Sequence, residues 1–137
     1  MKRARVFAVL VALCLLVAGV AQAEKSKKEL IAEAESAAPE TITKAATIKT
    51  PDGKVLRQGT NGWTCYPGSP AIGPMCNRPQ WDALLAALQK REPIKIKEFS
   101  VSYMLAGEGD AIGVSNSDPF ATTPVGSKDW VKEGPHL

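Results

Sequence analysis

The chain has 137 residues, a formal net charge of +3 and 45% hydrophobic residues, which suits one domain with one core. Three of the 17 basic residues lie in residues 1–23, and the remaining 14 equal the 14 acidic residues in number. The positive excess therefore belongs to the N-terminal segment, and the charge gives no basis for nucleic-acid binding.

The N-terminal segment has the pattern of a secretory signal. Basic residues within positions 1–5 precede the apolar run Val6–Val20, and the small-residue site Ala21-Gln22-Ala23 follows. The run is shorter than the ~20 residues that a spanning helix needs. We expect residues 1–23 to be a cleaved signal peptide and the protein to be periplasmic or extracellular, with no membrane span after cleavage.

The segment after the signal, residues 24–39, is rich in the helix formers Ala, Glu and Lys. Leu30 and Ile31 are its only large apolar side chains, and short helices without tertiary contacts are marginal. We expect a helical or flexible spacer that ends at Pro39, with a partner-binding helix as the alternative. Residues 40–137 should form a single α+β domain.

A β-hairpin is predicted from Thr41–Thr50 and Val55–Gln58. The connection Thr50-Pro51-Asp52-Gly53 places Pro at the second turn position and Gly where a left-handed conformation is needed. A period of two should put four residues of the first strand on one face: Ile42, Lys44, Ala46 and Ile48.

The stretch Gly59–Cys76 is so rich in Gly and Pro that we expect neither helix nor regular strand through it. Cys65 and Cys76 are the two cysteines that remain after signal cleavage, and an even count in an oxidising compartment predicts a structural disulfide. A redox pair would favour C-x-x-C, and zinc would need four ligands, so no metal is expected. Trp63 and Tyr66 should either cover the core or line a pocket, and both are binding candidates.

An amphipathic helix should follow, with Asn77 as N-cap and Pro93 after its end. Its apolar stripe predicts core packing rather than a cofactor face, so no cofactor is expected. The stripe consists of Trp81, Leu84, Leu85 and Leu88. Beyond it, Phe99–Leu105 should be a core strand with Phe99, Val101, Tyr103 and Leu105 on one face.

The loop Gly107–Pro119 carries several oxygen-bearing side chains that make it a candidate binding segment. The candidates are Glu108, Asp110, Asn116 and Asp118. Such oxygens suit a hard cation such as calcium, but the spacing lacks a third ligand and a distant bidentate Glu. His136 is the single histidine and is also a candidate.

Several short motifs occur together in residues 59–137: Asn61–Cys65, Pro74–Cys76, Trp81, Tyr103–Leu105, Gly113, Ser115-Asn116, Asp118-Pro119, Trp130 and Gly134–His136. In their order and spacing the chain resembles a family of small exported bacterial proteins of uncharacterised function. The resemblance implies no activity. It does imply that members continue beyond the Gly-Pro-His segment, so a C-terminally truncated form is one expectation.

Taken together, these features predict a small exported α+β domain, with a hairpin and sheet packed on one amphipathic helix and tied by a disulfide. We expect a non-enzymatic ligand-binding, partner-binding or structural module, whose partner is an envelope component or a small ligand. One alternative is a hydrolase that uses His136 with Asp118 or Asp110. Another is a domain stabilised by calcium.

Overall fold

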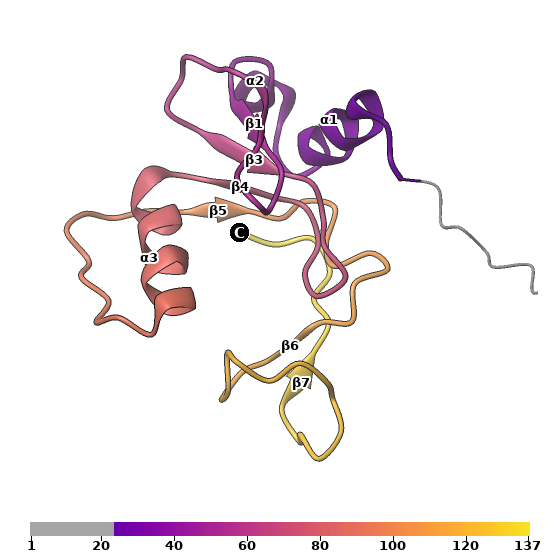
Figure 1. Cartoon of the computed structure of the whole chain (residues 1–137), viewed down its shortest axis with the longest axis vertical. Helices are drawn as coiled ribbons and strands as arrows, with labels where there is room; N and C mark the ends of the chain where they lie inside the picture. The colour runs from indigo at the N-terminus through magenta and orange to yellow at the C-terminus, as the bar shows by residue number, and fades with distance from the viewer. Residues whose placement is uncertain (1–23) are drawn as a thin grey trace, which may run out of the picture.

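The computed structural model of the protein describes residues 24–137, which form a small α+β fold around one five-stranded sheet (Figure 1). The predicted signal peptide lies outside the described residues. The elements in chain order are α1 (Lys27–Glu35), α2 (Glu40–Thr43), β1 (Thr47–Lys49), β2 (Val55–Arg57), β3 (Thr64–Tyr66), β4 (Met75–Asn77), α3 (Pro79–Lys90), β5 (Ser102–Tyr103), β6 (Val114–Ser115) and β7 (Trp130–Val131).

The main sheet has the strand order β2-β1-β3-β4-β5, and β6 and β7 form a separate hairpin. β1 pairs parallel with β3, whereas every other pair in the sheet is antiparallel. The predicted α+β class is therefore confirmed, with a mixed sheet. Figure 1 shows the β6–β7 hairpin apart from the main sheet, at the end where the long C-terminal loops lie.

The predicted hairpin turn is present between β1 and β2. Gly53 has a φ of 91° and its N–H donates to the carbonyl of Thr50 at 2.8 Å. The Thr50 hydroxyl also accepts from the N–H of Lys54 at 3.1 Å. A turn with glycine at its left-handed position thus sets the register of the two strands.

The strand predicted over Thr41–Ala46 is wrong, because this segment forms α2 and a turn. Pro39 precedes the helix in an extended conformation, and Glu40 lies in its first turn, where a negative charge is favoured. The N–H of Lys44 donates to the carbonyl of Glu40 at 3.1 Å. Regular strand begins only at Thr47.

Cys65 and Cys76 are paired residues of neighbouring antiparallel strands, with Cα atoms 4.0 Å apart and sulfur atoms at disulfide bonding distance. Both cysteines are fully buried. Two short strands therefore do form within the stretch predicted to have none, and the Gly and Pro residues concentrate in residues 67–74 between them. Because a disulfide bridges directly opposed residues, it holds the register of this pair.

The segment predicted as a spacer contributes to the core. Ala34, Ala37 and Ala38 are buried against the sheet face that carries the disulfide. The carbonyl of Ala37 accepts from the N–H of Leu105 at 2.9 Å, which ties the end of α1 to the segment after β5. Leu30 and Ile31 of α1 pack half-buried against the same cluster, so large and small apolar residues together attach this segment to the core.

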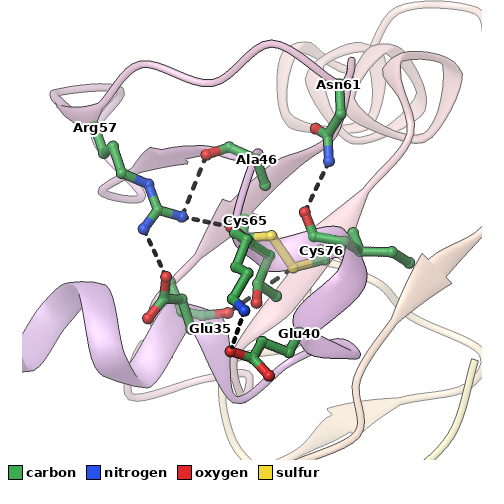
Figure 2. Close-up of polar contacts among 11 residues, drawn as sticks. Glu35, Glu40, Ala46, Arg57, Asn61, Cys65 and Cys76 are labelled. Carbon is green, nitrogen blue, oxygen red and sulfur yellow. Dashed lines mark hydrogen bonds and ion pairs between the residues drawn. A yellow bond between two sulfur atoms is a disulfide. The ribbon is translucent and has the colours of Figure 1, made fainter.

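An arginine joins α1, α2 and the edge strand β2 (Figure 2). Arg57 forms an ion pair with Glu35 at 2.6 Å and donates to the carbonyls of Thr43 and Ala46. One side chain thereby satisfies two carbonyls near the end of α2. The planar guanidinium suits several acceptors at once, which an ammonium group would not satisfy in the same geometry.

Residues 58–63 cross from the edge strand β2 to β3 and run against the segment that leads into β1. The N–H of Gly59 donates to the hydroxyl of Thr47 at 3.0 Å, and a Cβ at Gly59 would collide with the backbone of Ala45, Ala46 and Thr47. The Asn61 side chain donates to the carbonyl of Ile42 at 2.7 Å (Figure 2). Only glycine fits this approach.

Helix α3 occupies the predicted region, but its N-cap is Arg78, since Asn77 is the last residue of β4. Pro79 is the first helical residue, as the sequence pattern indicated. No residue of α3 is fully buried. Its apolar stripe lies half-buried, so the prediction that the stripe packs into the core is only partly met.

The strand predicted over Phe99–Leu105 is mostly absent. β5 has two residues, and Phe99 is 92% exposed. The buried residues are Ser102 and Met104, which alternate opposite to the predicted apolar face. Ser102 is buried because its hydroxyl donates to the side chain of Asn77 at 2.6 Å, a polar contact that hydrophobic periodicity does not reveal.

Replacing both Cys65 and Cys76 by Ala should lower the free energy of unfolding by about 3 kcal/mol, because the bridge closes a short loop in the unfolded chain. Urea unfolding of the oxidised protein and the double variant measures the difference. Equal stabilities would contradict this role of the bridge. Because both sulfurs are fully buried, a mild reductant should leave the folded protein oxidised.

Gly59→Ala should destabilise the protein by about 1–3 kcal/mol, because the added methyl group meets the backbone of the segment before β1. Gly134→Ala is the matched control, since a Cβ there has no atom within 4 Å, and its effect should stay within about 0.5 kcal/mol. Thermal unfolding of both variants gives the comparison. Similar losses in the two would refute the close approach at Gly59.

Candidate functional site

Trp63 and Tyr66 lie on opposite faces of the sheet. Trp63 packs against the core cluster, 5.5 Å from the ring of Tyr103, and the guanidinium of Arg78 lies 5.5 Å from its ring centroid. Tyr66 is next to Cys65 in β3, so it projects from the other face, where α3 packs. Trp63 covers the core, and the two aromatic residues do not line one pocket.

A polar cluster on the α3 side of the sheet joins Asp82 to the strands. Paired positions place Thr64, Asn77 and Ser102 on this face. The amide of Asn77, which is fully buried, donates to the carboxylate of Asp82 at 2.8 Å. Tyr66 approaches the same carboxylate. We call these five residues the Asp82 cluster.

Burial governs the ionisation of this cluster. Burial raises the pKa of Asp82, although hydrogen bonds from Asn77 and Tyr66 act in the opposite direction. Burial, together with the negative charge of Asp82, also raises the pKa of Tyr66. The groups partner one another, which indicates that the cluster holds the first turn of α3 on the sheet.

Glu108 has a structural role between two loops. Its side chain is buried and accepts from the N–H of Gly73 at 2.7 Å. A Cβ at Gly73 would collide with the carbonyl of Gly107, so the two backbones touch here. The N–H of Ile112 also donates to the carbonyl of Pro70 at 3.0 Å. Glu108 therefore fastens the 67–74 loop, between the two cysteines, to the start of the C-terminal loops.

A hollow of about 560 Å³ lies within the long loop of the β6–β7 hairpin. Its lining comes from residues 115–129 and is rich in hydroxyl groups. The polar side chains are Ser115, Ser117, Asp118, Thr123, Ser127, Lys128 and Asp129. We call this the serine hollow.

Asp129 organises the wall of the serine hollow. Its carboxylate accepts from the hydroxyls of Ser115, at 3.0 Å, and Ser127. The Ser115 hydroxyl in turn accepts from the N–H of Asp118 at 3.0 Å. The hydroxyls of Ser117 and Ser127 lower the pKa of Asp129, so this carboxylate is charged at neutral pH. The network links the two strands of the hairpin to both ends of its loop.

The remaining predicted candidates do not gather at one place. Asp110 and Asn116 are exposed, whereas Asp118 lines the serine hollow and accepts from the N–H of Phe120 at 2.9 Å. His136 pairs through its backbone with Met104 next to β5, and its Nδ1 lies 2.7 Å from the carbonyl of Gly134. No carboxylate among residues 24–137 forms an ion pair with His136.

The described part of the chain holds no group of three or more His, Cys, Asp or Glu side chains placed to bind a metal ion. Within the same range, no helix has the length and apolar character required to cross a bilayer. Comparison of the chain with protein-family models, curated proteins and solved structures gave no match.

Sequence reasoning missed Asp129 and Asp82, which are the two organising carboxylates. For Asp129, the available signal in the sequence was the close spacing of Ser and Asp residues within Ser115–Asp118 and Ser127–Asp129. Ser and Asp side chains readily form hydrogen bonds with nearby backbone and with each other. For Asp82, the available signal was the order Thr64-Cys65-Tyr66, because a strand with this order presents two hydrogen-bonding side chains on one face.

Asp82→Asn should change how stability depends on pH. The folded-state pKa of Asp82 is raised, so folding favours its protonated form, and the wild type loses stability as the pH rises from about 4 through the folded pKa. The variant does not ionise at this position, so its stability does not fall in this way, and its side-chain amide keeps an oxygen that accepts from Asn77. Urea unfolding from pH 3 to 7 should show the variant gaining on the wild type as the pH rises.

Asp52 provides the contrasting control, because a hydrogen bond from Thr50 lowers its pKa. The contribution of Asp52 to the stability of the folded protein is present above about pH 4 and is lost as the pH falls. Asp52→Asn should therefore lose stability relative to the wild type as the pH rises, opposite to Asp82→Asn. A difference between the wild type and Asp82→Asn that stays constant over the pH range would disprove the buried ionisation of Asp82.

Proposed function

We propose that this protein is an exported, non-enzymatic binding module whose serine hollow takes a small polyhydroxylated ligand of the cell envelope, such as a sugar. The observation that carries the proposal is the hollow itself: about 560 Å³, lined by four hydroxyl side chains, two carboxylates and one lysine. The hollow is shallow and opens broadly to solvent, and its volume lies within the range of small-molecule sites. Export is the expectation drawn from residues 1–23.

The chemistry of the lining supports this ligand class. The Ser115 and Ser127 hydroxyls donate to Asp129 and can only accept from a ligand, whereas the Thr123 hydroxyl can donate and accept, and a carboxylate accepts from several donors. A sugar offers hydroxyls that also donate and accept, so it can match such a lining without a strong charge of its own. Lys128, beside Asp118 and Asp129, adds a further donor and offsets part of their charge.

The frame of the hollow is built in advance of ligand binding. The indole N–H of Trp130 donates to the carbonyl of Ile112 at 2.7 Å, and a Cβ at Gly113 would collide with the carbonyl of Val131. These contacts join β6 to β7 at the base of the loop. A preformed site loses less conformational entropy on binding, which matters for a small polar ligand.

Thermal-shift and calorimetric titration of the chain from Glu24 onward against mono- and disaccharides tests the proposal. Binding should raise the melting temperature in a concentration-dependent manner. Thr123→Val removes one lining hydroxyl and should weaken binding by about tenfold, because it leaves a ligand hydroxyl unpaired.

Thr122→Val is the matched control, since Thr122 is the neighbouring exposed residue and does not line the hollow. It should bind like the wild type. The absence of stabilisation by any sugar in the panel, or equal losses in the two variants, would contradict the assignment of the hollow.

A further inference from the structure

The loop between α3 and β5 presents large apolar side chains to solvent. Residues 91–99 are exposed without interruption, and we call them the basic loop. Within it Ile94 is 46% exposed, Ile96 is 62% exposed and Phe99 is 92% exposed. In Figure 1 this loop runs outward beyond α3, and at its start the guanidinium of Arg91 lies 4.0 Å from the ring centroid of Phe120, in the loop between β6 and β7. Exposed apolar side chains gathered in one short loop mark an interaction surface.

Positive charge accompanies these apolar residues. The basic loop contains Arg91, Lys95 and Lys97 against Glu92 and Glu98, a net charge of +1, and Lys90 precedes it at the end of α3. The residues from 24 onward carry equal numbers of basic and acidic side chains, so this surplus is local. Lysine alternates with isoleucine from Ile94 to Lys97, so each isoleucine has a basic residue next to it in the chain.

The basic loop is held by its neighbours at defined points. The side-chain amide of Gln80 donates to the carbonyl of Lys95 and accepts from the N–H of Lys97, both at 3.2 Å. Where the loop returns to the sheet, the hydroxyl of Ser100 accepts from the N–H of Trp81 at 3.1 Å. These contacts fix the backbone along α3 while the apolar side chains remain outside the core.

We propose that the basic loop docks this protein on the surface of an anionic phospholipid bilayer. Phe99, Ile96 and Ile94 would enter the interfacial region, while Lys95 and Lys97 contact the headgroups. Charge complementarity argues for this occupant, because interleaved basic and apolar residues match a surface that is anionic outside and apolar beneath. A protruding loop also suits a deformable surface better than a shaped pocket does.

This surface is separate from the serine hollow, so the two proposals can fail independently. No residue of the basic loop lines the hollow. Sugar binding and bilayer binding are measured by different assays, and each variant below leaves the lining of the hollow unchanged. Docking on a bilayer surface also differs from spanning it, which would require a long apolar helix.

Co-sedimentation with lipid vesicles tests the proposal. The chain from Glu24 onward contains every contact described above and lacks the apolar run of residues 6–20, which would itself bind lipid. It should sediment with phosphatidylcholine vesicles that contain phosphatidylglycerol, and not with phosphatidylcholine alone. Raising the salt concentration should weaken the binding, because screening reduces the attraction of the lysines.

Two pairs of variants separate the contributions. Phe99→Ser should weaken vesicle binding by about tenfold, whereas Leu137→Ser, at a 74% exposed apolar residue outside both the basic loop and the hollow, should not. Lys95→Gln with Lys97→Gln should weaken binding by about fivefold per lysine. The control Lys27→Gln with Lys28→Gln, on the exposed start of α1, should leave binding unchanged.

Because all these positions are exposed, the variants should keep the wild-type melting temperature, which confirms that they fold. Three results would overturn the proposal. They are no sedimentation with anionic vesicles, equal losses in the control variants, and wild-type binding by Phe99→Ser, which would leave only non-specific charge attraction.

Discussion

The bridge between Cys65 and Cys76 is the constraint on which the rest of the fold depends. It joins the two central strands β3 and β4 at directly opposed residues, and both sulfurs are fully buried. On one side β3 pairs with β1, and on the other β4 pairs with β5 and leads into α3. A sheet of two- and three-residue strands has few ladder hydrogen bonds, so a covalent link at its centre replaces cooperativity that longer strands would supply.

The features that could be predicted from the sequence are those with local causes. The turn at Thr50–Gly53 needs only a proline and a glycine at set positions, and the start of α3 needs only Pro79 in its first turn. The disulfide was predicted from the expectation of export and the even count of the cysteines after residue 23. The small α+β class followed from these elements together, since each is specified by neighbours in the chain.

The features that could not be predicted depend on contacts between distant segments. The role of Asp129 follows from its contact with Ser115 on the other strand of the β6–β7 hairpin. Ser102 is buried because its hydroxyl donates to the side chain of Asn77 on the neighbouring strand. Hydrophobic periodicity also assumes that apolar residues face inward, and this assumption fails at Phe99, where the chain presents them to solvent. Small residues produce the converse error, because Ala34 and Ala37 give no strong apolar signal but are fully buried.

The parallel pairing of β1 with β3 has a consequence for how this chain can vary in length. Because β2 lies at the outer edge, residues 58–63 must return across the segment leading into β1, and they do so in backbone contact at Gly59. A side chain at Gly59 would collide with that segment, so the crossing has no space for a change at this point. Insertions and deletions are therefore accommodated elsewhere, in the exposed loops that follow α3 and β6. The close contact at Gly59 therefore limits variation at one point of the chain, and the exposed loops leave room for it elsewhere.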